Sequence, residues 1–568
     1  MTDTRLRLLT RHFFNGFFDV EIIHPTAESH LTVGHILAVL AAPGVMGGFG
    51  LLGKYLHIPT AALDQWADAV WRDKSFLLFY ASSMIGFVTV FQWDTLFPSR
   101  RDYVVFGQLP LRTGYILLAK VQALAAFLGL FTLAVNGITM VIFPLAANPP
   151  DASLGSAIWF FVSHWISILA ASAFLFLFLL FLQGAIMNLL PPHLFRRVSS
   201  IIQITSLVGL VLMLFTLPSS ERLLTLSRPT QHWFVYSMPP MWFLGLSEFL
   251  RGSPAPAFRH LASLAVFGFF AVLILAAGVY LLSYFRHIRR SLETAVEPII
   301  SPSWVSRLVT GALNRLWLRH PLERAVFYFI VKTAFRSRRH WLIWGAYAAV
   351  GFSLVLNVLL ALLVRRGYTA LAHPTPQLLA IPLVVTFLLL AGLRFAFTIP
   401  AELRANWVFR ITESAAHHAY AAATRKAFFV IGILPVLVPL LPVHAFLWGW
   451  TVALHHFLFC AILNWILIEI VLRRFHKIPF ACSYLPGKAN LPFTAGLYIS
   501  GFLTYVTSIP AIESGLFRNP SRWIVFYGVA AAIVAYLAIR RRKVFQGDLR
   551  FSFEEIPEPA VMTLNLRT

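Results

Sequence analysis

Two short segments of this chain, 94–120 and 399–426, carry charged and aromatic residues between long apolar runs. The charged groups could form ion pairs with a partner, and the aromatic rings would gain from burial away from water. Anchoring in the lipid headgroup layer accounts for either segment alone, whereas their matching positions favour docking to a soluble partner. The docking candidates are Asp94, Arg100, Arg101, Asp102, Tyr103 and Phe106 in the first segment and Glu402, Arg404, Trp407 and Phe409 in the second.

The two segments resemble each other in order as well as in composition. Each has a proline near its start, then mixed charge and aromatic residues, and each ends with a lysine. The proline-to-lysine distances differ, at 22 residues from Pro98 to Lys120 and 26 from Pro400 to Lys426. The pattern is therefore a weak internal repeat, which is typical of transporters built from duplicated helical halves.

The elements that position these segments follow from composition. Of the 568 residues, 58% are hydrophobic and 12% are charged, and the mean hydropathy is +0.74, which is too apolar for a soluble domain of this size. A bilayer core takes roughly 20 apolar residues per helix. We therefore expect an all-α integral membrane protein with about 12 transmembrane helices, at residues 33–53, 75–93, 119–146, 157–190, 198–217, 257–284, 341–363, 376–398, 427–443, 451–472, 493–514 and 523–540.

Lysine and arginine predict which loops face the cytosol, because these residues resist translocation. With a cytosolic N-terminus, the inward segments hold 33 basic residues and the outward segments, of which 54–74 is the first, hold 10. This bias and the even number of spans place both termini in the cytosol. The net charge of +23 then forms mostly a cytosolic rim facing anionic lipid, so it requires no nucleic-acid partner.

A polar, basic stretch separates six predicted spans from six. Each half opens with a basic, aromatic-rich segment, 5–18 or 323–341, that can form an amphipathic helix in the cytosolic interface. The expected organisation is a first six-helix half at 1–284, a cytosolic linker at 285–322, a second six-helix half at 323–543 and a cytosolic tail at 544–568.

The first segment, with Asp94, Arg100 and Asp102 followed by LPLRTGYILLAK (109–120), resembles the transmembrane subunits of type II ABC exporters. Further segments resemble a bacterial group of long, duplicated ABC exporter permeases: YSMPPMWFLGLSEFL (236–250), ANWVFR (405–410), KIPFACSYLPGKANL (477–491) and FEEIPEPAVMTLNL (553–566). The resemblance implies an inner (plasma) membrane location and segments 94–120 and 399–426 as coupling loops for a separate ABC ATPase. A second permease chain is also possible under this interpretation.

No nucleotide site of the chain's own is expected. The sequence contains no GxxxxGK[ST] phosphate loop, and around Lys488 the first glycine is missing while Ala489 replaces the magnesium-binding hydroxyl residue. ATP and magnesium are therefore expected on the partner ATPase, and the chain is predicted not to be an enzyme. No cofactor is expected in this chain, and no zinc-binding spacing of cysteines occurs.

Several ionisable groups lie within or beside the apolar runs, which makes them functional candidates by default. A structural role is favoured for each, because Arg394 can extend to the surface and Glu469 can pair with Arg473 one turn away. No acidic residue lies near the middle of a predicted span, which argues against a carboxylate proton relay. The groups are His35, His164, Arg394, His455, His456 and Glu469.

Two other classes of protein are alternatives. A secondary transporter of the major facilitator type shares twelve spans, a long basic central loop and acidic and arginine residues after the second span. That family requires a glycine before the acid, however, and Trp93 precedes Asp94 here. A polytopic membrane transferase would need an acid pair, or a histidine with a polar partner, at a defined depth.

Overall fold

The computed structural model describes residues 2–18, 29–57, 63–97, 102, 106, 113–149, 152–219, 233–253, 255–291, 310–315, 317–397, 399–401, 409, 411, 417–473, 475, 478–481 and 491–546. All regular structure within these residues is helical, as expected for an all-α protein. The chain divides into two compact units, Met1–Pro298 (unit 1) and Ile299–Thr568 (unit 2).

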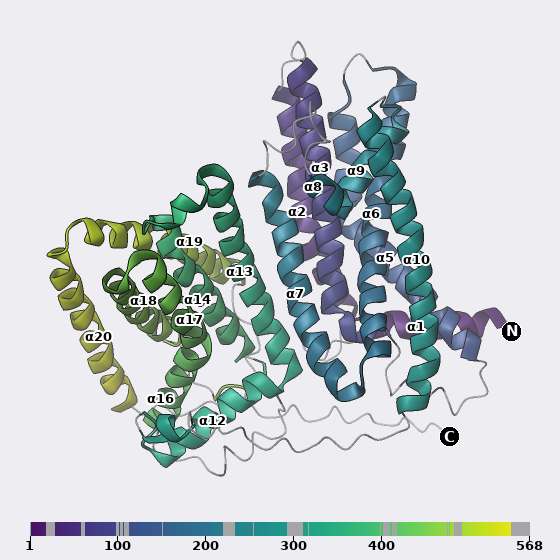
Figure 1. The fold of residues 1–568 in the computed structure, drawn as a ribbon. Helices are drawn as coiled ribbons and strands as arrows, with labels where there is room; N and C mark the ends of the chain where they lie inside the picture. Colours follow the sequence, from purple (N-terminus) through teal and green to yellow (C-terminus); the bar gives the residue numbers. More distant parts are fainter. Residues whose placement is uncertain are drawn as a thin grey trace, which may run out of the picture. The chain divides into compact units, whose positions relative to one another are not determined.

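Unit 1 contains a short N-terminal helix, a bundle of long helices and three shorter elements between them. They are α1 (Thr2–Gly16), α2 (Ser29–His57), α3 (Leu63–Phe91), η1 (Trp93–Thr95), α5 (Thr113–Ala146), α6 (Leu154–Leu189), α7 (Pro192–Ser219), α8 (Trp233–Ser237), α9 (Pro239–Leu250) and α10 (Pro256–Ser291). In Figure 1, α1 runs crosswise to the long helices. Both α1 and α2 pack on α5, while α6 packs on α3 and α10.

Unit 2 repeats the use of a short helix before a group of long ones. Its elements are α12 (Pro321–Arg336), α13 (Arg338–Arg366), η2 (Tyr368–Leu371), α14 (Pro376–Ala396), α16 (His417–Phe428), η4 (Phe429–Ile433), α17 (Leu434–Trp448), α18 (Trp450–Val471), α19 (Leu491–Arg518) and α20 (Arg522–Gln546). Figure 1 shows α12 crosswise to α13. α12 packs on α16, and α14 packs on α13, α18 and α19.

Ten helices of the described residues are long and apolar enough to cross a membrane, which confirms a multi-pass helical membrane protein. The two other predicted spans, 33–53 and 493–514, fall on α2 and α19, helices of 29 and 28 residues. Helices α5 and α6, with 34 and 36 residues, exceed one bilayer thickness, as their apolar runs predict.

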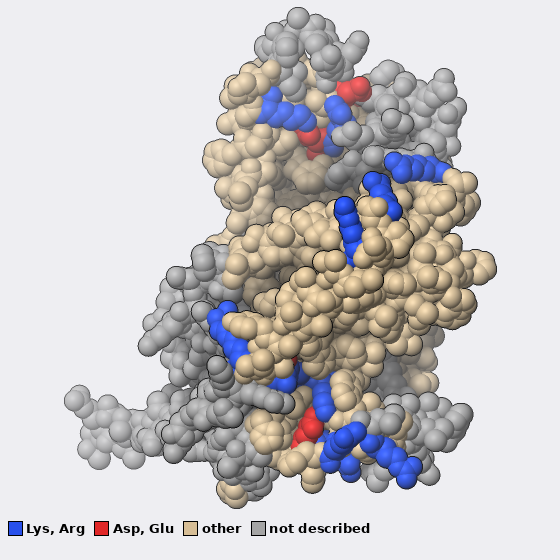
Figure 2. Space-filling model, turned by 90° about the vertical axis from the view of Figure 1, so that its left-hand side faces the viewer, with Lys and Arg blue, Asp and Glu red and all other residues tan. Residues whose placement is uncertain are grey.

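The exteriors of both units are apolar where lipid would surround them. In α20, Ile524 is 78% exposed and Val525 65%, and in α10, Phe267 is 75% exposed and Ile274 70%. Water would make such surfaces costly, whereas hydrocarbon does not. On the face drawn in Figure 2, large areas of the described surface carry no lysine, arginine, aspartate or glutamate.

The predicted outward loop 54–74 is wrong in its extent. α2 continues to His57, and α3 begins at Leu63. The early turns of α3 are amphipathic: they bury Trp66 and Trp71 while charged residues such as Arg72 remain exposed. These charges end the apolar run in the sequence, but they do not end the helix.

A single π-helical turn, η4, separates α16 from α17. Pro435 carries no N–H, so it cannot donate to the carbonyl of Ile431 four residues earlier, and its ring crowds that carbonyl. The turn widens instead, and Leu434 N donates to Phe429 O five residues earlier. A long apolar helix thus acquires a defined irregular point directly after its charged first turns.

Candidate functional site

The docking residues predicted from the sequence are partly described by the structure. Asp94 lies in η1, and Asp102, Phe106 and Phe409 are described as single helical residues. The other six candidates lie outside the described residues: Arg100, Arg101, Tyr103, Glu402, Arg404 and Trp407. The site is therefore built from these four residues and from the groups that hold the two segments in place.

The start of the first segment is fastened to three long helices. Trp93 Nε1 donates to Ser199 Oγ of α7 at 2.9 Å, and Gln183 Nε2 of α6 donates to the Trp93 carbonyl at 2.6 Å. Tyr280 of α10 donates to the Leu96 carbonyl at 3.3 Å. Trp93 and Leu96 are fully buried. The segment thus leaves the bundle from a fixed point.

Lys120, near the start of α5, contacts both the start of the first segment and the N-terminal helix. Its ammonium donates to the Thr95 carbonyl at 2.8 Å and lies over the rings of Phe13 of α1 and of Phe17 just after α1, at 5.0 and 4.7 Å from their centroids. Cation–π contacts strengthen when the cation is desolvated, and Lys120 is only 4% exposed. Lys120 therefore joins η1, α1 and α5 at one point.

The first segment also contacts α1 directly. His12 Nε2 lies 3.9 Å from Asp102 Oδ1, and the Phe106 ring packs edge-on against His12 with a centroid distance of 5.3 Å. Phe106 also packs on Phe13 at 5.6 Å. We call the assembly of α1, η1, Asp102, Phe106 and Lys120 the first corner.

The second segment has a comparable assembly. Lys426 Nζ, in the last turn of α16, pairs with Glu323 Oε1 of α12 at 2.6 Å and donates to the Trp317 carbonyl at 2.5 Å. It also lies 5.4 Å from the centroid of the Trp317 ring. Phe409 packs edge-on against Phe329 of α12 at 5.0 Å. We call α12, Trp317, Phe409 and Lys426 the second corner.

The start of the second segment is fixed by hydrogen bonds to its backbone. His340 Nε2 of α13 donates to the Ile399 carbonyl at 2.8 Å, and Ala401 N donates to the Phe480 carbonyl at 2.8 Å. Phe480 adopts a positive φ of 63°, which is unusual for a bulky residue. Its ring packs on His340 and Phe397 at 4.5 and 4.8 Å, and these contacts hold the strained conformation.

Glu469, which pairs with the neighbour of Lys426 on α16, has different partners from the one predicted from the sequence. Glu469 does not take its neighbour Arg473 as the partner: Arg425 Nε lies 3.4 Å from Glu469 Oε1, and an Arg541 guanidinium nitrogen lies 2.9 Å from the same oxygen. Both arginines come from helices other than α18. Arg473 is not placed one helical turn from Glu469, because α18 ends at Val471. Glu469 thus joins α16, α18 and α20.

The linker side of the second corner adds a weaker contact. Tyr328 of α12 donates to Asn314 Oδ1 at 2.9 Å, and Arg324 donates to the Leu318 carbonyl at 3.2 Å. Burial raises the pKa of Tyr328, so its hydroxyl remains a donor at neutral pH. The residues before α12 are thereby folded onto it.

Sequence reasoning missed a buried acid in unit 2. Glu513 of α19 is fully buried, and its Oε1 lies 2.7 Å from Nδ1 of His456 on α18. His444 packs against His456 with a ring distance of 5.0 Å, and Cys460 follows His456 by one turn. Glu513 lies near the end of the predicted span 493–514 and of α19, so it does not contradict the prediction that no acid lies near the middle of a span, but its burial and its histidine partner were not predicted.

Unit 1 contains a buried ion pair that the sequence did not predict. Lys74 Nζ of α3 lies 2.5 Å from Glu248 Oε1 of α9 and 4.8 Å from the Phe160 ring centroid, and the Arg251 guanidinium lies 4.3 Å from the same ring. Hydropathy alone places Lys74 in a loop, which does not anticipate its burial. The pair joins helices distant in sequence and lies apart from the first corner in the contacts described.

A further carboxylate nearby pairs with the end of α2. Asp73 accepts from Lys54 Nζ and from the Tyr55 hydroxyl, each at 2.7 Å. Burial and the Asp73 carboxylate raise the pKa of Tyr55. The tyrosine therefore stays protonated and keeps the hydrogen bond that fastens α2 to α3.

Within the described residues no group of three or more His, Cys, Asp or Glu side chains could hold a metal ion. Comparison of the chain with protein-family models, curated proteins and solved structures finds no match. Any function must therefore be argued from the residues and from the geometry of the two corners.

Proposed function

We propose that this chain is the membrane-spanning permease subunit of an ATP-driven ABC exporter. In this proposal the chain has about 12 spans in two similar halves, both termini face the cytosol, and the protein lies in the bacterial inner membrane. The proposal unites the sequence resemblance with one structural observation. In both units an aromatic residue of the predicted coupling segment rests on a crosswise helix, and a lysine ties that helix to the next membrane helix.

This arrangement supports a lever mechanism. Displacement of the first segment would be passed through Phe106 to α1 and through Lys120 to α5. A helix of 34 residues moves largely as one body, so a shift at its end changes its packing along the membrane. In unit 2, Phe409 and Lys426 would pass a displacement to α12 and α16, next to the irregular turn η4.

The energy source in this proposal is a separate ABC ATPase. ATP and magnesium bind to that partner, and this chain contributes the path and the docking segments. Two segments per chain would accommodate two ATPase subunits, and a second permease chain remains part of the proposal as an alternative assembly. The exposed Asp94 in η1 is one described group that such a partner could contact.

Affinity purification of the full chain from its native membrane tests the proposal. An ABC ATPase should co-elute and hydrolyse MgATP, and the double reversal Arg101→Glu/Glu402→Lys should remove most of it. The control Arg366→Glu/Arg518→Glu reverses two charges outside both segments and should retain the ATPase. Wild-type amounts of ATPase after the first reversal would contradict docking at these segments.

A secondary transporter is the second candidate, and one observation favours it. The buried His456–Glu513 pair is a proton-binding group within the helices of unit 2, which are otherwise predominantly apolar. Proteoliposomes containing the chain alone, with a pH gradient and no nucleotide, separate the two candidates. Gradient-driven transport that Glu513→Gln abolishes would replace the ABC proposal. A transferase is not proposed, because His456 and Glu513 are enclosed at 2% and 0% exposure and a substrate could not reach them.

A further inference from the structure

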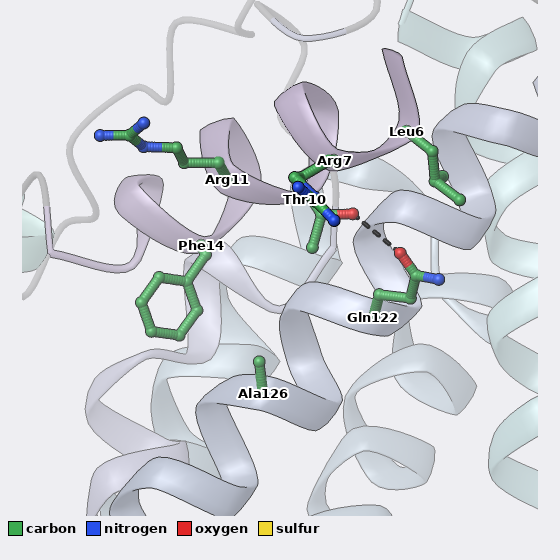
Figure 3. Close-up of a pocket in the computed structure, with 7 residues that line it drawn as sticks. All are labelled: Leu6, Arg7, Thr10, Arg11, Phe14, Gln122 and Ala126. Carbon is green, nitrogen blue, oxygen red and sulfur yellow. Dashed lines mark hydrogen bonds between the residues drawn. The ribbon is translucent and has the colours of Figure 1, made fainter. Parts of the chain in front are cut away.

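A cavity of about 470 Å³ lies between α1 and α5 in unit 1. Figure 3 shows Arg7 and Arg11 on consecutive turns of α1, above Gln122 and Ala126 of α5. Thr10 Oγ1 donates to Gln122 Oε1 at 2.9 Å and fixes the two helices at this point. The lining consists of Leu6, Arg7, Thr10, Arg11, Phe14, Gln122 and Ala126.

One wall of this cavity is suited to an anion. Arg7 and Arg11 are four residues apart, so both side chains start from the same face of α1, and Figure 3 shows the Arg7 guanidinium beside Thr10 and the Arg11 guanidinium extending away from it. Both are exposed, and no carboxylate lies among the lining residues. A guanidinium offers a planar fork of donors that matches the oxygens of a phosphate group.

The other wall is suited to hydrocarbon. Leu6, Phe14 and Ala126 contribute apolar surface, and Leu118, one helical turn before Gln122, is 45% exposed. Because α5 is apolar enough to cross a membrane from Gly114 onwards, apolar surface at Ala126 would lie against acyl chains below the headgroup layer. A ligand that fills the cavity should therefore carry both a negative headgroup and an apolar tail.

We propose that this cavity binds an anionic phospholipid, with its phosphate between Arg7 and Arg11 and the first part of an acyl chain against Phe14 and Ala126. Free phosphate would share the headgroup chemistry, but it would leave the apolar wall unused. The bound lipid would fasten α1 to α5 beside Lys120. The proposal requires only that the chain lies in a bilayer, so it stands independently of coupling to an ATPase.

Retention of lipid by the purified full chain tests this site. The chain is loaded with either phosphatidylglycerol or phosphatidylcholine in detergent, and bound lipid is counted by native mass spectrometry. Wild type should retain phosphatidylglycerol, and Arg7→Gln/Arg11→Gln should bind it about thirtyfold more weakly, the factor expected for two basic residues at a membrane surface. The control Arg5→Gln removes an exposed arginine of α1 that does not line the cavity, and it should change retention little.

Two further experiments distinguish a specific lipid site from non-specific electrostatic attraction of lipid. Ala126→Trp keeps both arginines but fills the apolar wall, so it should also lower phosphatidylglycerol retention. Inorganic phosphate at millimolar concentration should not displace the lipid. Unchanged retention in the double arginine variant or in Ala126→Trp, or displacement by phosphate, would overturn the proposal. Thermal unfolding of each variant confirms that the fold is retained.

Discussion

The two corners each contain a lysine that ends its segment, but different interactions hold the two lysines. In the first, the Lys120 ammonium contacts two phenylalanine rings and one backbone carbonyl. In the second, the Lys426 ammonium pairs with the Glu323 carboxylate in addition to a carbonyl and a ring. A lysine that ends a predicted docking segment can thus be held by aromatic ring faces or by a carboxylate.

The difference predicts different consequences when a partner is lost. Removal of the Glu323 carboxylate leaves the partly buried Lys426 cation without its counter-charge, which is costly. Removal of one ring from the first corner leaves a second ring and a carbonyl in place. The second corner should therefore be the more fragile, although it contains the stronger pair.

The largest effect is expected for Glu323→Gln. Lys426 would keep the Trp317 carbonyl and ring but lose its counter-charge, so the free energy of unfolding should fall by about 3 kcal/mol. Chemical unfolding in detergent measures the change. The double variant Glu323→Leu/Lys426→Met removes both charges and should recover most of the loss. Equal stability of the single variant and the wild type would show that the ion pair does not hold α12 to α16.

A smaller effect is expected for Lys120→Met in the first corner. The substitution retains most of the apolar stem and removes one hydrogen bond and two cation–π contacts, so stability should fall by about 2 kcal/mol. The same unfolding assay applies, with Val121→Met as a control on the exposed side of α5. A loss larger than that of Glu323→Gln would reverse the ranking of the two corners.

The aromatic contacts of the two segments should have smaller and nearly equal effects. Phe106→Leu and Phe409→Leu each remove an edge-on aromatic contact, worth about 1 kcal/mol. Amide hydrogen exchange should rise in α1 for the first variant and in α12 for the second. Exchange that rises in neither helix would mean that these rings do not fasten the segments to the crosswise helices.

The membrane class could be predicted from composition, because many apolar runs of bilayer length in one chain are typical of helices that cross a membrane. The lysines at the corners could be predicted from the weak repeat, since Lys120 and Lys426 end the two similar segments. Their partners could not. Glu323 and Trp317 lie about a hundred residues from Lys426, and helical periodicity identifies neighbours only within about one turn.

For Glu469, helical periodicity named a partner that the structure does not use. Periodicity offered Arg473 as its partner, yet α18 ends at Val471, so the spacing that would join the pair is lost. Packing of α16 and α20 supplies Arg425 and Arg541 instead. The burial of Glu513 was missed for a related reason, since its partner His456 lies on α18, 57 residues away, and periodicity does not identify such a neighbour.

The smallest effect is expected for the Arg541–Glu469 ion pair, which lies beside the second corner. Arg541 is 31% exposed and Arg425 10%, so solvent screens the Arg541–Glu469 pair more strongly. Arg541→Gln should lower the free energy of unfolding by less than about 1 kcal/mol, and the exposed neighbour Arg540→Gln should have no measurable effect. If Arg541→Gln instead matches Glu323→Gln, the charges of Arg425, Lys426, Glu469 and Glu323 act as one network. The two corners would then differ in that only the second adjoins a network of acidic and arginine side chains, because the described contacts of the first corner include no such pair.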